Sequence, residues 1–139
     1  MISLHLAQYL ADNGFGRVAL TGSETGNDLI YFEKLPLGKT GLYIMSNPTP
    51  LTREQRMQQS VDIYARGRND LEGGQLLGDV VEFLRDTYGT CDLPVVPGYS
   101  EEQYRDCVFT PEQNISNQGL DATDRVIYSV SVNITYTEV

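Results

Sequence analysis

Residues 125–136 read Arg-Val-Ile-Tyr-Ser-Val-Ser-Val-Asn-Ile-Thr-Tyr, and this stretch decides the fold class. Apolar and polar side chains alternate along it, with Ile127 as the one exception, which is typical of a β-strand with one buried face. At about 3.4 Å per residue it spans roughly 40 Å, longer than most strands. We expect a strand of this length to project beyond its own core, where it would pair with another chain unless something covers it.

A second alternating stretch, residues 57–66, predicts another strand with one buried face. It leads into residues 70–88, where apolar side chains recur at the spacing of a helix. The sequence therefore predicts a strand followed directly by a helix. The apolar stripe of that helix consists of Leu77, Val80, Val81, Leu84 and Tyr88.

The ends of this helix carry recognisable signals. Asn69 is expected to cap the N-terminus, with Glu72 three residues later as in a capping box. Gly89 is expected to end the helix in a left-handed conformation. Gly73 and Gly74 weaken the first turn, and we favour fraying over close packing against a neighbour as their effect.

The N-terminal third predicts smaller elements. Residues 3–13 form a short amphipathic helix, with Ser3 as its cap. Residues 17–21 and 29–32 flank a turn-rich segment, which indicates an antiparallel hairpin, and residues 41–45 form a third strand.

Residues 107–109 predict a short strand, and residues 110–124 a polar loop. So long a loop is usually functional or ordered by a partner. Together the elements predict an α+β fold: a mainly antiparallel sheet with a long C-terminal strand, packed against about two helices. The length of 139 residues predicts a single domain over residues 1–139.

The net charge of −9 argues against binding to nucleic acid or to anionic membranes, because phosphates are held by Lys and Arg. The acidity serves solubility, or it belongs to a surface that must not hold DNA. We find no signal peptide and no apolar run long enough for a membrane span. Two cysteines do not form a disulfide scaffold, so free thiols in a reducing cytoplasm are expected.

The chain lacks the residue sets of common active sites. His5 is the one histidine, expected opposite or beside the apolar face of its helix, and one histidine makes neither a zinc site nor a general base for every nucleophile. We therefore expect no enzyme activity, no metal and no cofactor. Arg66 and Arg68 are the tightest basic cluster, and ion pairs with Asp62, Asp70 or Glu72 are a simpler role for them than nucleic-acid binding. Nine tyrosines reflect strand propensity or an interface.

The order of elements resembles the tail terminator family of long-tailed bacteriophages, also called tail completion or minor capsid proteins. The resemblance rests on residues 57–89 and 106–137, where a loop of residues 117–125 precedes a final strand rich in Val, Ile and Tyr. It implies a hexameric ring that caps the tail tube, stops its growth and meets the head-tail connector, with DNA passing through the lumen without specific binding. It also implies a place in the virion, at the tail-neck junction, after synthesis in the host cytoplasm.

No individual residue carries over from the family. Our expected contacts to neighbouring subunits or partners are Arg66, Arg68 and Asp70 at the strand–helix turn, and Asn117, Gln118, Asp121 and Asp124 in the polar loop. Two alternatives remain open at this point. One is another virion part, a neck or head-completion protein or a tail-tube subunit. The other is a small-molecule-binding or enzymatic α/β domain, which would need a closed apolar pocket with convergent polar groups.

Overall fold

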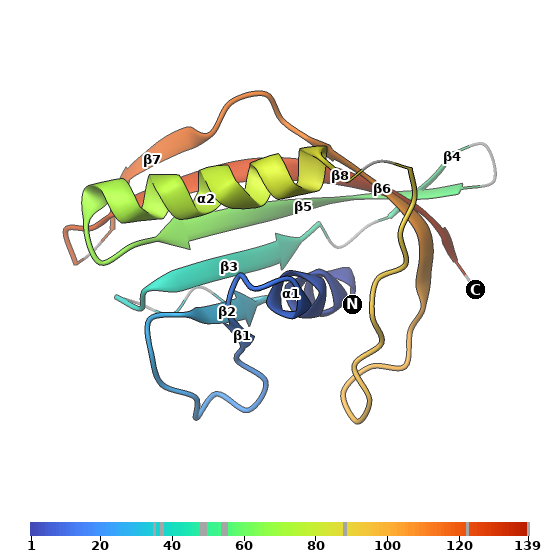
Figure 1. Cartoon of the computed structure of the whole chain (residues 1–139), viewed down its shortest axis with the longest axis horizontal. Helices are drawn as coiled ribbons and strands as arrows, with labels where there is room; N and C mark the ends of the chain where they lie inside the picture. Colours follow the sequence, from blue (N-terminus) through green and yellow to red (C-terminus); the bar gives the residue numbers. More distant parts are fainter. Residues whose placement is uncertain are drawn as a thin grey trace.

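The computed structural model describes residues 1–34, 36, 38–47, 50–53, 56–87, 89–121 and 123–138. Within them, two helices lie against one eight-stranded, mostly antiparallel sheet, so the expected α+β fold is confirmed (Figure 1). The helices are α1 (Ile2–Asp12) and α2 (Asp70–Arg85). The strands are β1 (Arg17–Val18), β2 (Leu29–Phe32), β3 (Gly41–Ser46), β4 (Leu51–Arg53), β5 (Arg56–Arg66), β6 (Tyr104–Pro111), β7 (Ser116–Leu120) and β8 (Val126–Glu138).

The strand order is β1-β2-β3-β5-β8-β6, with β4 beside the start of β5 and β7 beside the start of β8. β1, β2 and β3 run parallel, and the remaining pairs are antiparallel. The expected antiparallel hairpin of residues 17–32 is therefore wrong. Apolar runs around a turn do not specify strand direction, and residues 19–28 are a long enough connection to return the chain to the edge where β1 began. Gly41, at φ +144°, allows the parallel approach, since a Cβ there would stand 2.2 Å from the Leu29 carbonyl oxygen.

The long C-terminal strand lies inside the sheet. β8 pairs with β5 along almost its whole length, and with β6 and β7 on its other side. The expected projecting strand is wrong, because residues 104–120 fold back and cover its second edge. The polar loop expected over residues 110–124 is also wrong in part, since it contains the end of β6 and all of β7.

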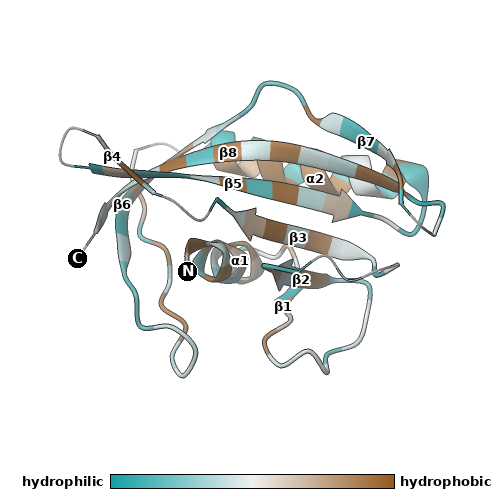
Figure 2. Cartoon of the chain, turned by 180° about the vertical axis from the view of Figure 1, so that it is seen from behind, coloured by the Kyte–Doolittle hydropathy of each residue, from teal (hydrophilic) through white to brown (hydrophobic). Residues whose placement is uncertain are grey.

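The period-two patterns of β5 and β8 are confirmed. Val61, Ile63, Val130, Val132 and Ile134 are buried on one face. Apolar and polar residues alternate as colour bands along both strands (Figure 2). The buried face of each strand therefore points to the core that the helices close.

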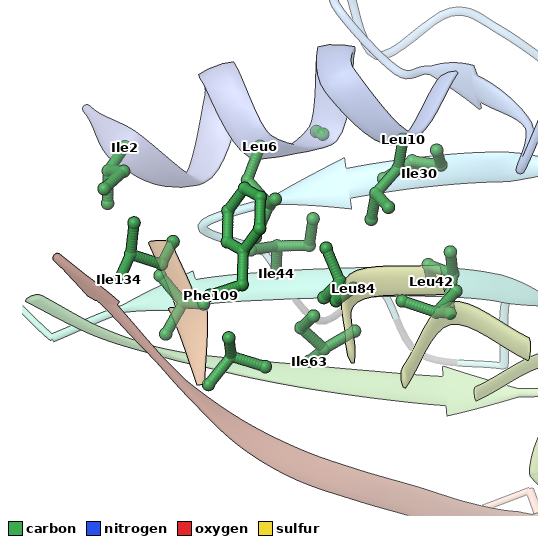
Figure 3. Close-up of a cluster of buried hydrophobic side chains, with 14 of the residues drawn as sticks. Ile2, Leu6, Leu10, Ile30, Leu42, Ile44, Ile63, Leu84, Phe109 and Ile134 are labelled. Atoms are coloured by element: carbon green, nitrogen blue, oxygen red, sulfur yellow. The ribbon is translucent and has the colours of Figure 1, made fainter. Parts of the chain in front are cut away.

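Both helices cover this same face of the sheet. Leu6 and Leu10 of α1 point toward β2 and β3, and Leu84 of α2 points toward β5 (Figure 3). Burial of each such side chain stabilises the fold by about 1.5–3 kcal/mol. Ser3 is not the cap of α1, because the helix begins one residue earlier and Ser3 is buried within its first turn.

The predicted cap of α2 is confirmed, whereas its predicted end is wrong. The Asn69 side-chain oxygen accepts hydrogen bonds from the second and third amides after it, at 3.1 and 3.0 Å. The helix ends at Arg85, before Gly89. The Thr87 hydroxyl donates to the Phe83 carbonyl at 3.1 Å and so takes the acceptor that the next helical amide would use. Tyr88 lies outside the described residues.

Gly73 in the first turn of α2 serves close packing, so our preference for fraying is wrong for this glycine. A Cβ on Gly67 would stand 2.4 Å from the backbone nitrogen of Gly73. Added Cβ atoms on Gly73 and Gly74 would each lie 3.4 Å from the ring of Tyr128. A Cβ on Gly67 or Gly73 would therefore crowd the backbone where α2 starts, whereas a Cβ on Gly74 would make an ordinary contact with the Tyr128 ring.

Candidate functional site: the arginine corner and the helix-free face of the sheet

The face of β5 and β8 that the helices do not cover carries polar side chains. Alternation places Ser60, Asp62, Ser131 and Asn133 on this face, since their neighbours are buried on the other. The Ser60 hydroxyl donates to Asn133 Oδ1 at 2.9 Å, and the Ser131 hydroxyl to Asp62 Oδ1 at 2.5 Å. These cross-strand hydrogen bonds hold the polar face of the β5–β8 pair in register.

At the parallel end of the sheet the same face carries a small aromatic cluster. Leu29, Tyr31 and Tyr43 are buried there, with Tyr64 packed against them. The rings of Tyr31 and Tyr43 stack with centroids 5.2 Å apart and planes 11° apart. Burial raises the pKa of Tyr43 to about 12, although the neighbouring Arg66 opposes that shift. The Tyr43 hydroxyl is therefore neutral at physiological pH.

Arg66 ends β5, with a side chain only 4% exposed. Its Nη1 donates to the carbonyl oxygens of Pro36 and Lys39 and to the Tyr43 hydroxyl, each at 2.9 Å. Its Nε lies 2.5 Å from Asp121 Oδ2 in an ion pair, and its guanidinium carbon lies 5.3 Å from the centroid of the Tyr43 ring. We call this set of five residues the arginine corner. Arg66 thus joins three chain segments that are distant in sequence.

Asp121 begins the turn that leads into β8. Its Oδ1 accepts from the Thr123 hydroxyl at 2.7 Å, from the Thr123 amide at 2.8 Å and from the Arg125 amide at 3.0 Å. The hydrogen bond from the Thr123 hydroxyl is the main cause that lowers the pKa of Asp121 to about 2. Arg125 in turn donates to the Gly38 carbonyl at 3.2 Å and to the Thr40 hydroxyl at 2.8 Å. Two arginines therefore hold Pro36, Gly38, Lys39 and Thr40 against the end of the sheet.

The structure thus brings two predicted site residues, Arg66 and Asp121, into direct contact. Arg68 is exposed, and its Nε lies 3.0 Å from Glu72 Oε2, so the predicted local ion pair is confirmed for this arginine. Asp70 begins α2, and its carbonyl accepts from the Tyr128 hydroxyl at 3.0 Å. For Arg66 the expected local partners are wrong, because its carboxylate comes from a turn far along the chain.

The other predicted residues lie on β7 and the turn after it. Asn117 and Gln118 are exposed on β7, where the Gln118 side chain donates to the Ser129 hydroxyl at 2.7 Å. Asp124 is exposed in the turn at φ +59°, a left-handed conformation that Asp tolerates better than most residues. These side chains are open to solvent, whereas Arg66 and Asp121 face each other inside the corner.

His5 is fully buried, so the expectation that it lies opposite or beside the apolar face of its helix is wrong. Its Nδ1 lies 2.7 Å from the Pro94 carbonyl oxygen and its Nε2 lies 2.8 Å from the Ser100 hydroxyl. The Tyr104 ring stands edge-on to it, with centroids 5.0 Å apart. His5 therefore anchors residues 94–100 to α1. The sequence holds no local signal for this, because both partners lie in a loop far along the chain.

Cys91 and Cys107 are free thiols that face each other across a short antiparallel bridge. Burial raises the pKa of Cys107 to about 12 and also raises the pKa of Cys91. Both thiols are therefore protonated at neutral pH. Within the described ranges, no group of three or more His, Cys, Asp or Glu side chains is arranged to hold a metal ion.

In comparison with known proteins, no protein-family model and no curated protein matches the chain. In the described part of the chain, neither helix has the length and apolar character needed to cross a membrane.

Proposed function

We propose that this chain is a tail terminator of a long-tailed bacteriophage. It is a structural subunit that forms a ring, caps the tail tube, ends tube elongation and joins the tail to the head connector. The observation that carries the proposal is that the two resembling segments, residues 57–89 and 106–137, make one structural unit. β5 and β8 pair from Met57 opposite Tyr136 to Arg66 opposite Ile127, and α2 packs across both strands.

Charge supports the same proposal. The net charge of −9 gives a wall that repels DNA, which suits a lumen that must let DNA pass. The helix-free face of β5 and β8 is polar, with Asp62 among its side chains. This part of the sheet could therefore line a lumen without exposing apolar side chains to water.

The exposed residues around the arginine corner remain our candidates for contacts with neighbouring subunits, with the tube protein or with the connector. They are Arg68 and Asp70 at the start of α2, and Asn117, Gln118 and Asp124 near β7. Arg66 and Asp121 have a different role in this proposal. They hold the corner in shape, so that the exposed residues are presented together.

The decisive experiment measures the mass of the purified protein by light scattering, alone and with tail tubes, and images both samples by negative stain. Rings of about six subunits that block further growth of added tubes support the terminator. Open-ended tubes identify a tube subunit instead, and binding to connectors but not to tubes identifies a neck protein. A monomer that ignores tubes and connectors contradicts the proposal and favours a small-molecule-binding domain.

A further inference from the structure

Four basic residues, Lys34, Lys39, Arg66 and Arg125, lie at one end of an acidic chain. The chain has ten basic residues in all, and Lys34 and Lys39 are its only lysines. Arg66 and Arg125 hold the segment around Lys39 through its carbonyl oxygens, as described above. Four of the ten cations therefore gather at one end of a molecule whose net charge is −9.

The two lysines line a pocket at the ends of β1 and β2, together with Tyr31 and Phe32. The pocket has a volume of about 170 Å³, below the roughly 300–1,000 Å³ of sites for small-molecule ligands. It is therefore sized for one or two side chains. Its wall is completed by Ala19, Gly22, Glu24 and Pro36.

The positive charge of this pocket is available to a partner. Among the described residues of the wall, Glu24 is the one that is acidic, and its carboxylate accepts from the Thr21 hydroxyl and from the amides of Thr21 and Gly22. Lys34 and Lys39 are exposed, and within the described residues neither ammonium has an ion pair. The pocket thus combines apolar walls with two cations, which suits a carboxylate next to an aromatic ring.

A projection with the opposite character lies elsewhere on the chain. Residues 96–100 form a tight turn in which the amides of Tyr99 and Ser100 donate to the Val96 carbonyl at 3.0 and 2.9 Å. Tyr99 lies in this turn and is 54% exposed, and Glu101, two residues later, is also exposed. His5 holds the base of the turn through Ser100. The projection is therefore an exposed aromatic side chain and a carboxylate on a turn whose shape is already set.

The pocket and the projection lie at opposite ends of one side of the molecule. The segments after β1 and before β6 extend from the same side of the sheet, with α1 between them, in both views (Figures 1 and 2). A surface at one end that fits a surface at the other end makes a heterologous contact, and such contacts generate rings when the rotation closes.

We infer that the lysine pocket of one copy receives the turn of residues 96–101 from the next copy. Tyr99 fills the pocket, and the Glu101 carboxylate lies between Lys34 and Lys39. This inference rests on the proposed ring, and it specifies which surfaces of neighbouring copies are in contact. DNA is a poorer occupant, because two exposed lysines around a side-chain-sized pocket neutralise too few phosphates for binding.

The first test compares Lys34→Gln/Lys39→Gln with Gln75→Glu/Gln113→Glu, which changes the net charge equally at exposed positions on and beside α2. Sedimentation measures the subunit association of both variants. We expect the lysine variant to associate at least about tenfold more weakly and the control to match wild type. Lys34→Glu/Lys39→Glu should be weaker still and should recover when combined with Glu101→Lys. Equal association of all variants, or no recovery, overturns the inference.

A second test detects the contact even when association is weak. Tyr99→Cys protein is mixed with Lys34→Cys protein under mild oxidation, with Gln75→Cys as the control partner. A disulfide-linked dimer with Lys34→Cys but not with Gln75→Cys supports the inference, and equal linkage overturns it. Rings of wild-type protein without this linkage contradict the inference alone, whereas a wild-type chain that neither forms rings nor binds tubes contradicts the proposed function. Lysine variants that lose DNA binding but keep association would assign the pocket to DNA and also overturn the inference.

Discussion

Replacement of Arg66 by alanine tests whether the arginine corner holds the fold together. The side chain is 4% exposed and makes three hydrogen bonds of 2.9 Å, besides its ion pair with Asp121. Alanine leaves two carbonyl oxygens, a hydroxyl and a carboxylate without their partner in a place that water reaches poorly. Removing one member of such a buried pair costs about 3–5 kcal/mol, because the groups left behind remain desolvated. Since a domain of this kind is stable by about 5–15 kcal/mol, the loss is a large fraction of the total.

The assay is urea unfolding followed by circular dichroism, with the free energy of unfolding taken from the midpoint and slope. Arg68→Ala is the matched control two residues away. Arg68 is 66% exposed, and its one ion pair among the described residues is with Glu72, four residues later, so its loss should cost about 0.2–1 kcal/mol. Arg66→Lys should recover only part of the stability, because an ammonium cannot reproduce the planar fork of the guanidinium. A loss below about 1 kcal/mol for Arg66→Ala, or equal losses for both alanine variants, would refute this reasoning.

Three further predictions follow from the same structure. Because the pKa of Asp121 is lowered to about 2, its ionised form stabilises the fold above about pH 4, and this contribution is lost as the pH falls toward 2. The thermal midpoint of Asp121→Asn should therefore change less between pH 4 and pH 2 than that of the wild type. Gly67→Ala should lower the free energy of unfolding by about 1–3 kcal/mol, because the added Cβ would stand 2.4 Å from a backbone nitrogen. Gly78→Ala should raise it by about 0.5–1 kcal/mol, because its Cβ has no neighbour nearer than 4.0 Å and alanine favours the helix. Chemical denaturation of both variants distinguishes overpacking from helix propensity. His5→Ala should lower stability by about 1–3 kcal/mol and open residues 94–101 to protease before the rest of the chain, and uniform cleavage would contradict its anchoring role.

The parts of the fold that could be predicted are those with a local periodic signal. β5, α2 and β8 were predicted within a few residues, because each carries an apolar face long enough to show its period. The Asn69 cap was predictable for the same reason, since its acceptor and donors lie within three residues. The ion pair of Arg68 with Glu72 likewise joins residues only four positions apart.

The candidate site depends on contacts between distant segments, and here prediction failed. Arg66 was expected to pair with a carboxylate close in sequence, but its partner Asp121 comes from the turn before β8. His5 was expected opposite or beside the apolar face of its helix, yet it is buried and bound to Pro94 and Ser100. Pairing across such separations depends on which strands become neighbours, and hydrophobic periodicity does not contain that information.

The sequence by itself determined which face of each long element is buried, because side-chain periodicity and solvent act on each element separately. Only the tertiary structure decided the direction of β1, β2 and β3, the central place of β8 and the closure of the arginine corner. Each of these depends on the path of the connecting segments: residues 19–28 return the chain for parallel pairing, and residues 104–120 cover the edge that β8 would otherwise expose. The entropy lost on closing a loop grows only slowly with its length, so these long connections do not themselves favour one arrangement of the strands. The packing of the whole chain selects among the arrangements.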